Sequence, residues 1–384
     1  MRYIQSSLFK SDRLRLNDAI ELSLASLRVY GPNYRHWSIA YSGGKDSSAT
    51  VTFVVWAIRE KLVDPPDTLT VLYADTRMEI PPLNTSALEM LQTLRLQRIN
   101  ARVVLPDLDK RFYVYMLGYG VPPPKNRFRW CTPMIKVTPM LEALKHLRQE
   151  TGEKLLMITG VRLGESEIRD QRIALSCSRE DGECGQGWFQ VSTPESIADT
   201  LAPLVHWRLC HVYDWIYFHQ DRHGFDLSAI ATVYGEGDIR TGCIGCNLVD
   251  HDTALRRLIR KPLWLHLRPL LEIKSLYREL IKPKYRKRKA LPEKRKDGQW
   301  SVNVQRMGPL TMEARAFGLA TIQDIQYRAA VDLINNREEA RIREMWALDM
   351  WPRRWSANDI DATQPIDALF LGDNGKIIKQ GLLI

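Results

Sequence analysis

The chain of 384 residues has few cysteines and no long apolar run. Thr52 interrupts the apolar stretch from Val51 to Ile58, so no segment is long enough to cross a bilayer. The first 30 residues are amphipathic and charged and lack the apolar core of a secretory signal. We therefore expect a cytoplasmic protein with no membrane partner. Six cysteines in a chain of this length do not make a disulfide scaffold, and clustered cysteines favour metal or redox chemistry instead.

A Walker A loop is also missing, because Ile39 stands where its first glycine belongs and Asp46 follows the lysine. The chain has Ser42-Gly-Gly-Lys-Asp-Ser47 instead. An apolar run at 37–40, typical of a buried strand, precedes this loop, and a helical pattern at 49–58 follows it. The loop therefore links a strand to a helix.

The composition of this loop predicts a phosphate site. Gly43 and Gly44 let the backbone bend sharply and approach a ligand. Amide N–H groups of the loop and of the following helix then point at one spot, where Ser42 and Ser47 add hydroxyls and Lys45 adds a positive charge. Such a site would lie at the carboxyl end of a strand, where open parallel sheets bind ligands. The alternative is a tight turn with no ligand.

Strands and helices alternate about every 30 residues after this loop, which predicts an α/β protein with a parallel sheet. We expect four domains or segments. They are an N-terminal helical segment (1–35), a nucleotide-binding domain with the cysteines (36–250), a basic helical segment (251–300) and a C-terminal helical region that ends in a hairpin (301–384).

Two further groups would share the ligand-binding edge. Asp75 follows the second strand and could hold Mg²⁺ on a bound pyrophosphate, or it could be a helix-capping or loop carboxylate. The stretch from Gly160 to Arg172 carries Arg162, Glu165 and Arg169 at spacings that share one face of a helix. Its guanidinium groups could grip phosphate oxygens, and the alternative is a solvated, salt-bridged helix.

The cysteines suggest a metal centre. Cys243 and Cys246 form a Cys-x-x-Cys pair on a glycine-rich turn, and Cys131 and Cys184 lie in polar loop contexts. A cluster or zinc site needs about four thiolates. An iron–sulfur cluster, a zinc ion and no metal at all stay open. Cys210 is expected to pack within a helix.

The charge is uneven. The formal net charge is +10, yet residues 256–296 hold 16 Lys and Arg and 3 Glu, so the rest of the chain is slightly negative. A local basic surface suits a polyanion such as nucleic acid, with Trp264, Tyr277 and Tyr285 available to stack on bases. The alternative is the solvated face of an amphipathic helix. The candidate contacts to nucleic acid are Lys282, Lys284, Arg286, Lys287, Arg288, Lys289, Lys294 and Arg295.

These motifs together resemble a known family. The loop at 42–47, Ala74-Asp-Thr76, the stretch from Arg129 to Pro139, Gly160 to Ser166 and Pro203 to Trp207 are similar to the PAPS reductase family of PP-loop ATP pyrophosphatases. Among its branches, the chain most resembles DNA phosphorothioation sulfurtransferases of the DndC/SspD type. The resemblance implies a HUP-like fold of the adenine nucleotide α-hydrolase kind.

The chain departs from the family pattern at two places. Trp130 stands where cluster-bearing reductases have the first cysteine of a Cys-Cys pair, so a fourth cluster ligand must come from elsewhere, with Cys184 the first choice and Cys177 the second. No cysteine follows Cys246, whereas reductases carry a catalytic one near the C-terminus. The resemblance therefore favours sulfur transfer over sulfate reduction.

The resemblance implies a function and its site. ATP and Mg²⁺ would serve to adenylate a DNA backbone phosphate oxygen with release of pyrophosphate, before sulfur from a cysteine desulfurase enters, alongside other phosphorothioation proteins. A 4Fe–4S cluster would be held by Cys131, Cys184, Cys243 and Cys246. An adenylylsulfate or PAPS reductase and a tRNA-thiolating enzyme are the alternatives. The implied catalytic residues are Lys45, Asp46, Asp75, Arg162, Glu165 and Arg169. The implied ATP-binding residues are Tyr41, Ser42, Gly43, Gly44, Lys45, Asp46, Ser47, Asp75, Gly160 and Arg162.

Overall fold

The computed structural model describes most of the chain. The described residues are 14–126, 128–164, 170–171, 182–183, 188–190, 197–235, 241–249, 251–294, 298–301, 305–372 and 375–379. Glu165, Arg169, Cys177, Cys184 and Arg295 therefore lie outside the described residues. Among the residues that are described, no helix is both long and apolar enough to cross a membrane.

The chain forms two compact units, each assembled from separate stretches of sequence. We call the first the sheet unit; it comprises Met1–Asp75, Pro81–Leu105 and Pro139–Thr241. We call the second the helical unit; it comprises Thr76–Ile80, Pro106–Thr138 and Gly242–Ile384. The cysteines at 131, 243 and 246 belong to the helical unit, and the loop at 42–47 belongs to the sheet unit.

The sheet unit is built on a sheet with the strand order β3-β2-β1-β4-β7-β6-β5. The first five strands in this order run parallel, and β6 and β5 add antiparallel strands at one edge. Their bounds are β1 His36–Tyr41, β2 Thr68–Ala74, β3 Asn100–Val104, β4 Leu155–Ile158, β5 Gly182–Glu183, β6 Trp188–Gln190 and β7 Ala198–Ala202. The predicted α/β fold with a parallel sheet is thus confirmed.

The strand order places a switch point beside β1. The chain moves outward from β1 through β2 to β3 and then returns to the other side of β1 as β4. Loops that leave β1 and β4 therefore diverge, and ligands of open α/β sheets bind in the crevice that this divergence leaves. The glycine-rich loop follows β1, and Gly160 follows β4.

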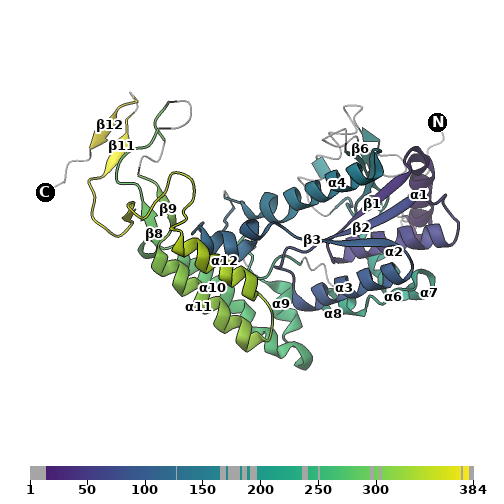
Figure 1. Ribbon diagram of the computed structural model, residues 1–384. Coiled ribbons are helices and arrows are strands. Elements are labelled where there is room, and N and C mark those ends of the chain that lie inside the picture. Colours follow the sequence, from purple (N-terminus) through teal and green to yellow (C-terminus); the bar gives the residue numbers. More distant parts are fainter. Residues whose placement is uncertain are drawn as a thin grey trace, which may run out of the picture. The chain divides into compact units, whose positions relative to one another are not determined.

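Helices cover both faces of the sheet, as right-handed crossovers require. Figure 1 shows α2 and α3 on one face and α4 on the other. Leu144 and Leu147 of α4 pack with Leu72 and Leu155 of the strands in one apolar cluster. The helices of this unit are α1 Leu16–Tyr30, α2 Lys45–Arg59, α3 Pro81–Leu96, α4 Thr138–Thr151, α6 Leu209–Phe218, α7 Gln220–His223 and α8 Ser228–Tyr234.

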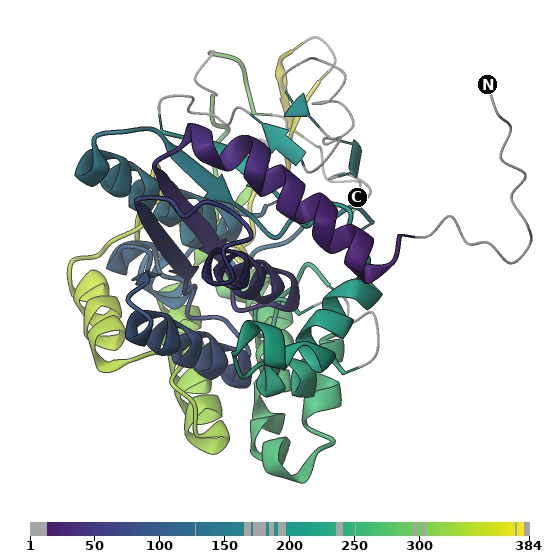
Figure 2. The same cartoon turned by 90° about the vertical axis from the view of Figure 1, so that its right-hand side faces the viewer.

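Helix α1, dark purple in Figure 2, is anchored to the segment that follows β7. The indole of Trp207 donates to Ser23 Oγ at 2.9 Å, and Ser23 Oγ donates to the carbonyl of Pro203 at 2.8 Å. Trp207 also packs edge-on against Phe53 of α2. These buried contacts fix the carbonyl of Trp207, which takes part in the site described below.

The helical unit combines short helices with two small sheets. Strand β8 lies between β10 and β9 in an antiparallel sheet, and β11 pairs with β12 in a hairpin. The helices, green in Figure 1, are α9 Thr253–Leu258, a 3-10 helix at Pro262–Leu271, α10 Glu272–Leu280, α11 Met312–Ala329 and α12 Asn336–Ala347. The strands are β8 Arg286–Arg288, β9 Met307–Leu310, β10 Ile360–Asp361, β11 Leu369–Leu371 and β12 Ile377–Lys379.

Two local expectations were wrong. The segment 251–300 is not helical throughout, because helical turns end at Tyr285 and the chain continues as β8. Pairing with β9 and β10 supplies the backbone hydrogen bonds that a helix would have supplied. Cys210 does lie in helix α6, but its side chain is exposed rather than packed.

Candidate active site

The loop between β1 and α2 has the backbone that its glycines predict. Gly43 has φ of +72°, a conformation that side chains disfavour, and Gly44 precedes the first residue of α2. Ser47 Oγ donates to the carbonyl of Gly44 at 3.0 Å and lies 3.0 Å from Ser42 Oγ. These hydrogen bonds hold the two ends of the bend together. The first turn of α2 then presents its free N–H groups at the edge of the sheet, an arrangement that binds anions.

An ion network stands at the start of α2. Lys45 Nζ lies 3.0 Å from Asp46 Oδ2, and Arg162 Nε lies 2.6 Å from Asp46 Oδ1. Arg162 Nη1 also donates to the carbonyl of Trp207 at 3.1 Å. Lys45 and Arg162 are 6% and 4% exposed, so both charges are largely removed from water. Asp46 is thus clamped between two buried cations.

The charge of this network is fixed at neutral pH. Burial alone would raise the pKa of Asp46, but the charges of Arg162 and Lys45 and their hydrogen bonds more than offset it and hold the pKa below its usual value. The carboxylate therefore stays ionised. Two cations and one anion leave an excess positive charge beside the N-terminus of α2. An anionic ligand such as a pyrophosphate group is favoured there.

Strand β4 approaches this network closely. A Cβ on Gly160 would lie 2.9 Å from the carbonyl oxygen of Asp46 and 3.0 Å from the amide nitrogen of Ser47. Any larger residue would push the loop after β4 away from α2. Glycine is needed here for close approach, and this approach brings Arg162 within reach of Asp46.

Asp75 lies at the same edge of the sheet, just beyond β2. Tyr73 of β2 pairs with Tyr41 of β1, so Asp75 and the glycine-rich loop leave neighbouring strands at one level. The amide of Asp75 donates to the carbonyl of Val104 at 3.0 Å, and the residue is 9% exposed. Asp75 thus belongs to the same end of the sheet as the glycine-rich loop, and its predicted role in holding Mg²⁺ stays a prediction.

The structure brings most of the predicted nucleotide site together, and it changes the role of one member. Arg162 was expected on a helix face, but it lies in a non-helical segment and its guanidinium is bound to Asp46. Glu165 and Arg169 lie outside the described residues, so their predicted roles stay predictions. The described members are Tyr41, Ser42, Gly43, Gly44, Lys45, Asp46, Ser47, Asp75, Gly160 and Arg162.

Sequence reasoning missed Tyr234. Its ring centroid lies 5.0 Å from Lys45 Nζ, and its hydroxyl is hydrogen-bonded to Thr241. A Cβ on Gly44 would lie 3.1 Å from the same hydroxyl. Tyr234 thus forms a wall of the loop and helps to hold the lysine. The sequence around Tyr234 does not predict this role, because the contact with the loop forms only in the folded chain.

The helical unit gathers three of the predicted cluster cysteines. The amide of Cys246 donates to the carbonyl of Cys243 at 3.1 Å, which closes a tight turn. The turn is packed closely, because a Cβ on Gly245 would lie 2.4 Å from Ile273. The fields of Cys131 and Cys246 both act on Cys243, so the three thiols are neighbours.

The thiols share their surroundings with a lysine and a glutamate. Burial raises the pKa of Cys243 to about 11, the charge of Lys136 opposes this rise, and Glu79 adds to it. The pKa of Cys131 is likewise raised by burial and by Cys246. Conversely, the charge of Cys243 raises the pKa of Lys136, against the effect of burial. Lys136 therefore offsets part of the rise in the pKa of Cys243, which nevertheless stays above its usual value.

These thiols fit a metal centre only in part. In the described residues, no group of three or more His, Cys, Asp or Glu side chains is arranged to hold a metal ion. Cys131, Cys243 and Cys246 nevertheless belong to the same unit and influence one another electrostatically, and thiolates are what iron–sulfur and zinc sites require. The predicted fourth ligand, Cys184, and its alternative, Cys177, lie outside the described part.

The predicted nucleic-acid contacts are mostly paired within the protein. Lys287 Nζ lies 3.0 Å from a carboxylate oxygen of Asp361, and Lys289 Nζ lies 2.8 Å from one of Asp359. Lys282 and Lys284 both pair with Glu279. Lys294 lies over the ring of Trp300 at 5.1 Å. The predicted basic residues are therefore less available to bind nucleic acid than the sequence suggests, because carboxylates elsewhere in the chain neutralise part of their charge.

Two of the three aromatic residues predicted to stack on bases are engaged elsewhere. Tyr277 is buried and donates to the hydroxyl of Tyr113 at 3.2 Å. Tyr285 stacks on Phe317 with ring centroids 5.5 Å apart. Tyr277 in particular lies inside the fold, where a Cβ on Gly245 of the cysteine turn would be 3.4 Å from its ring.

Comparison with known proteins finds a matching family model and a curated relative. The family model of the phosphoadenosine phosphosulfate reductase domain matches residues 36–246. An uncharacterized protein of Methanocaldococcus jannaschii is 27% identical over 244 residues, which cover 61% of this chain and 49% of that protein. The chain thus spans about half the length of this curated relative.

Three solved structures show weaker likeness. An FMN adenylyltransferase of Candida glabrata with FMN and an ATP analogue gives 16% identity, a TM-score of 0.35 and coverage of 55% of this chain and 60% of that one. A PAPS reductase of Candida auris is 13% identical with a TM-score of 0.32, and the match covers 54% of this chain and 88% of that one. The U34-tRNA thiolase of Methanococcus maripaludis with its [4Fe-4S] cluster is 11% identical with a TM-score of 0.33, and the match covers 73% of this chain and 89% of that one.

Proposed function

Because the chain belongs to the phosphoadenosine phosphosulfate reductase domain family, we propose that it is an ATP pyrophosphatase that activates a DNA backbone phosphate for replacement of an oxygen by sulfur. The observation that carries this proposal is the network of Lys45, Asp46 and Arg162 at the N-terminus of α2, beside the switch point of the sheet. A sulfurtransferase of the DndC/SspD type would perform this reaction.

The loop at 42–47 would hold the β- and γ-phosphates of ATP. The free N–H groups of α2, the hydroxyls of Ser42 and Ser47 and the ammonium of Lys45 are preorganised donors for the charge that grows on leaving pyrophosphate. Asp46 keeps Lys45 and Arg162 in position without titrating. Asp75 would bind Mg²⁺, which neutralises phosphate charge.

The chemistry would take two displacements at phosphorus and one at sulfur. A non-bridging oxygen of the DNA phosphate attacks the α-phosphorus of ATP, and the bond from that phosphorus to the leaving pyrophosphate breaks. The DNA phosphate is then joined to AMP as an anhydride. A cysteine desulfurase supplies the sulfur as a persulfide, whose outer sulfur attacks the DNA phosphorus, and AMP departs with the former DNA oxygen and the bonding electron pair. A thiol reductant then attacks the inner sulfur of the resulting P–S–S linkage, which leaves the outer sulfur on phosphorus as a thiolate and forms a disulfide between the carrier and the reductant.

An iron–sulfur cluster would be held by Cys131, Cys243 and Cys246, with Cys184 or Cys177 as further ligand. When bound, such a cluster supplies a redox or sulfur-carrying centre. The chain's own part here is to gather three thiols and to place Lys136 so that its charge offsets part of the rise in the pKa of Cys243.

A PAPS or adenylylsulfate reductase is the second candidate, since the matching family model bears that description. Incubation of anaerobically purified protein with ATP, Mg²⁺, a sulfur donor and radiolabelled sulfur separates the candidates. Label in DNA supports the proposal, and label in tRNA alone indicates a tRNA-thiolating enzyme. Release of sulfite from adenylylsulfate or PAPS, with no labelled nucleic acid, would replace the proposal by the reductase.

A further inference from the structure

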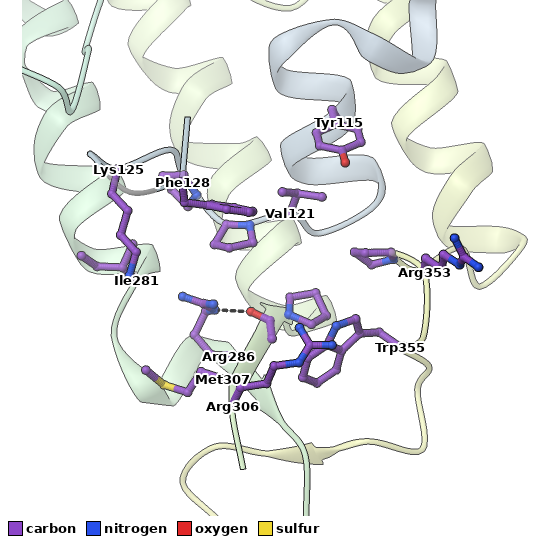
Figure 3. Close-up of a pocket in the computed structure, with 15 residues that line it drawn as sticks. Tyr115, Val121, Lys125, Phe128, Ile281, Arg286, Arg306, Met307, Arg353 and Trp355 are labelled. Atoms are coloured by element: carbon purple, nitrogen blue, oxygen red, sulfur yellow. Dashed lines mark hydrogen bonds between the residues drawn. The ribbon is translucent and has the colours of Figure 1, made fainter. Parts of the chain in front are cut away.

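A pocket of about 480 Å³ lies within the helical unit, and nothing above assigns it a role. Three segments contribute most of its lining: residues 121–125 with Phe128, the strands β8 and β9, and the turn at 352–355 that follows α12. Figure 3 shows the labelled side chains of Phe128, Arg306 and Trp355 around the opening. Its volume falls in the range of sites for small ligands of the size of one nucleotide.

The pocket is lined by cations and by no acidic side chain. Lys125, Arg286, Arg306 and Arg353 all contribute to its wall. Arg306 is paired with Glu293 at 2.9 Å. For Arg286 and Arg353, the described residues provide no carboxylate within ion-pair distance. A concave wall of this charge attracts phosphate groups.

Arg286 is the least expected of these cations. It is only 9% exposed, and its Nε donates to the carbonyl of Gly308 at 2.6 Å, as Figure 3 shows. Burial lowers its pKa to about 10, so it remains charged at neutral pH. A buried cation that only a carbonyl accompanies is costly unless an anion completes it. The pocket gives such an anion access to the guanidinium.

The aromatic side chains supply the other half of a recognition site. Phe128 leaves 42% of its surface exposed, although it is a large apolar residue. The ring of Trp355 is held in place, because a Cβ on Gly308 would lie 2.1 Å from it. The guanidinium of Arg306 and the ammonium of Lys289 lie 4.9 Å and 4.5 Å from the centroid of that ring, so Trp355 supports the cations of the wall. An exposed aromatic face beside arginines, such as that of Phe128, is what unpaired bases stack on.

We propose that this pocket binds one unpaired nucleotide of a nucleic-acid strand, with its base against Phe128 and its phosphate on Arg286 and Arg353. The inference rests on the proposed function in so far as nucleic acid is the substrate. It names the place where the strand is gripped. Phe128 lies three residues before Cys131, so one short stretch of the chain carries a pocket wall and, at the start of the helical turns that follow, a thiol.

The test is strand binding by the full chain, with fluorescence anisotropy of labelled 12-residue single-stranded DNA, single-stranded RNA and duplex DNA. Phe128→Ala should weaken binding of single strands about tenfold, since a stacked base contributes on that order. Arg353→Glu should weaken it as strongly and flatten its dependence on salt. Matched controls are Tyr327→Ala, which removes an aromatic residue that is 86% exposed, and the exposed Arg260→Glu.

The controls should stay within twofold of the parent protein. A preference between the DNA and RNA strands then identifies the source of the nucleotide. Unchanged strand binding in both pocket variants would overturn the pocket and leave the proposed function standing. Absence of strand binding in the parent protein, with ATP still cleaved, would instead remove nucleic acid as substrate. Displacement of the strand by polyglutamate, with no effect of Phe128→Ala, would assign the pocket to an acidic polypeptide.

Discussion

At the scale of single residues, the site depends on Asp46. Its carboxylate is shared by Lys45 and Arg162, at 3.0 Å and 2.6 Å. The three groups satisfy one another when no ligand is present, which lets two cations remain buried near a future phosphate position. The desolvation free energy of the two buried cations is partly offset, because each cation keeps an anionic partner.

Replacing Arg162 by Met should destabilise the fold as well as the site. Removal of one partner leaves the other buried charges uncompensated, which costs about 3 kcal/mol. Chemical denaturation measures the free energy of unfolding. Arg102→Met is the matched control, because Arg102 pairs with Glu150 where both side chains are substantially exposed, and such a pair contributes less than about 1 kcal/mol. Equal decreases in the free energy of unfolding in the two variants would contradict a stabilising pair between Arg162 and Asp46.

Buried His223 gives a pH dependence of stability. Burial lowers its pKa from 6.5 to about 4, and its Nδ1 accepts from the amide of Phe225 at 3.1 Å. Between these values the unfolded chain binds more protons, so stability falls as the pH drops from 6.5 to 4 and is complete above 6.5. The loss should reach about 3 kcal/mol at most.

In His223→Asn the amide oxygen can accept the same hydrogen bond and nothing titrates. The variant's stability should therefore change less between pH 6.5 and 4 than that of the parent. Urea denaturation at several pH values measures the difference between the two curves. Parallel curves would show that His223 does not titrate in this range.

The roles of the loop residues were predictable because they depend only on neighbouring residues in the sequence. Gly43, Gly44 and Lys45 act through backbone freedom and charge, which are visible in six consecutive letters. Tyr234 and the carbonyl of Trp207 were not predictable, since only the folded chain brings them to the loop. The role of Arg162 was half predicted: its place at the site was expected, and its pairing with Asp46 was not.

At the scale of elements, the critical contact is the approach of the segment after β4 to the start of α2. Gly160→Ala places a Cβ 2.9 Å from the carbonyl of Asp46, so one of the two must move. We expect an ATP affinity about tenfold lower with a small change in stability, measured by isothermal titration and thermal unfolding.

The control is Gly152→Ala, where a Cβ meets no atom within 4 Å and only backbone strain is introduced at φ of +76°. It should lower stability and leave ATP affinity unchanged. If both variants bound ATP like the parent, the close approach would have no part in the site.

The alternation of strands and helices was predictable because periodicity and glycine punctuation report it directly. The basic stretch at 286–288 was not recognised as a strand. Its residues carry no apolar alternation, and what makes them a strand is pairing with β9 and β10 from far along the chain. Acidic partners at Asp359 and Asp361 come with that pairing, which charge counting over a local window misses.

At the scale of the whole molecule, the candidate sites lie in different units. The candidate nucleotide site belongs to the sheet unit, and the thiols at 131, 243 and 246 belong to the helical unit together with the cationic pocket. Each unit is interrupted in sequence by the other. A boundary drawn along the sequence therefore differs from the division that compactness gives, because long-range pairing decides which stretches belong together.

Metal analysis tests the assignment of the thiols. Anaerobically purified protein should contain iron and acid-labile sulfide and absorb in the visible range typical of iron–sulfur clusters. Cys131→Ser and Cys243→Ser should each lose most of both, whereas Cys210→Ser, which alters an exposed cysteine in α6, should retain them. Zinc in place of iron would establish the zinc alternative. Full iron content in Cys243→Ser would contradict the ligand set.

Cleavage of ATP between its α- and β-phosphates at the loop is tested by the identity of the products formed from ATP. With Mg²⁺ and DNA present, chromatography should show AMP and pyrophosphate in equal amounts. In Lys45→Met both should fall at least about 100-fold, since a preorganised positive charge on the leaving group is lost. Formation of ADP and phosphate, or unchanged release of AMP by Lys45→Met, would contradict cleavage between the α- and β-phosphates at this loop.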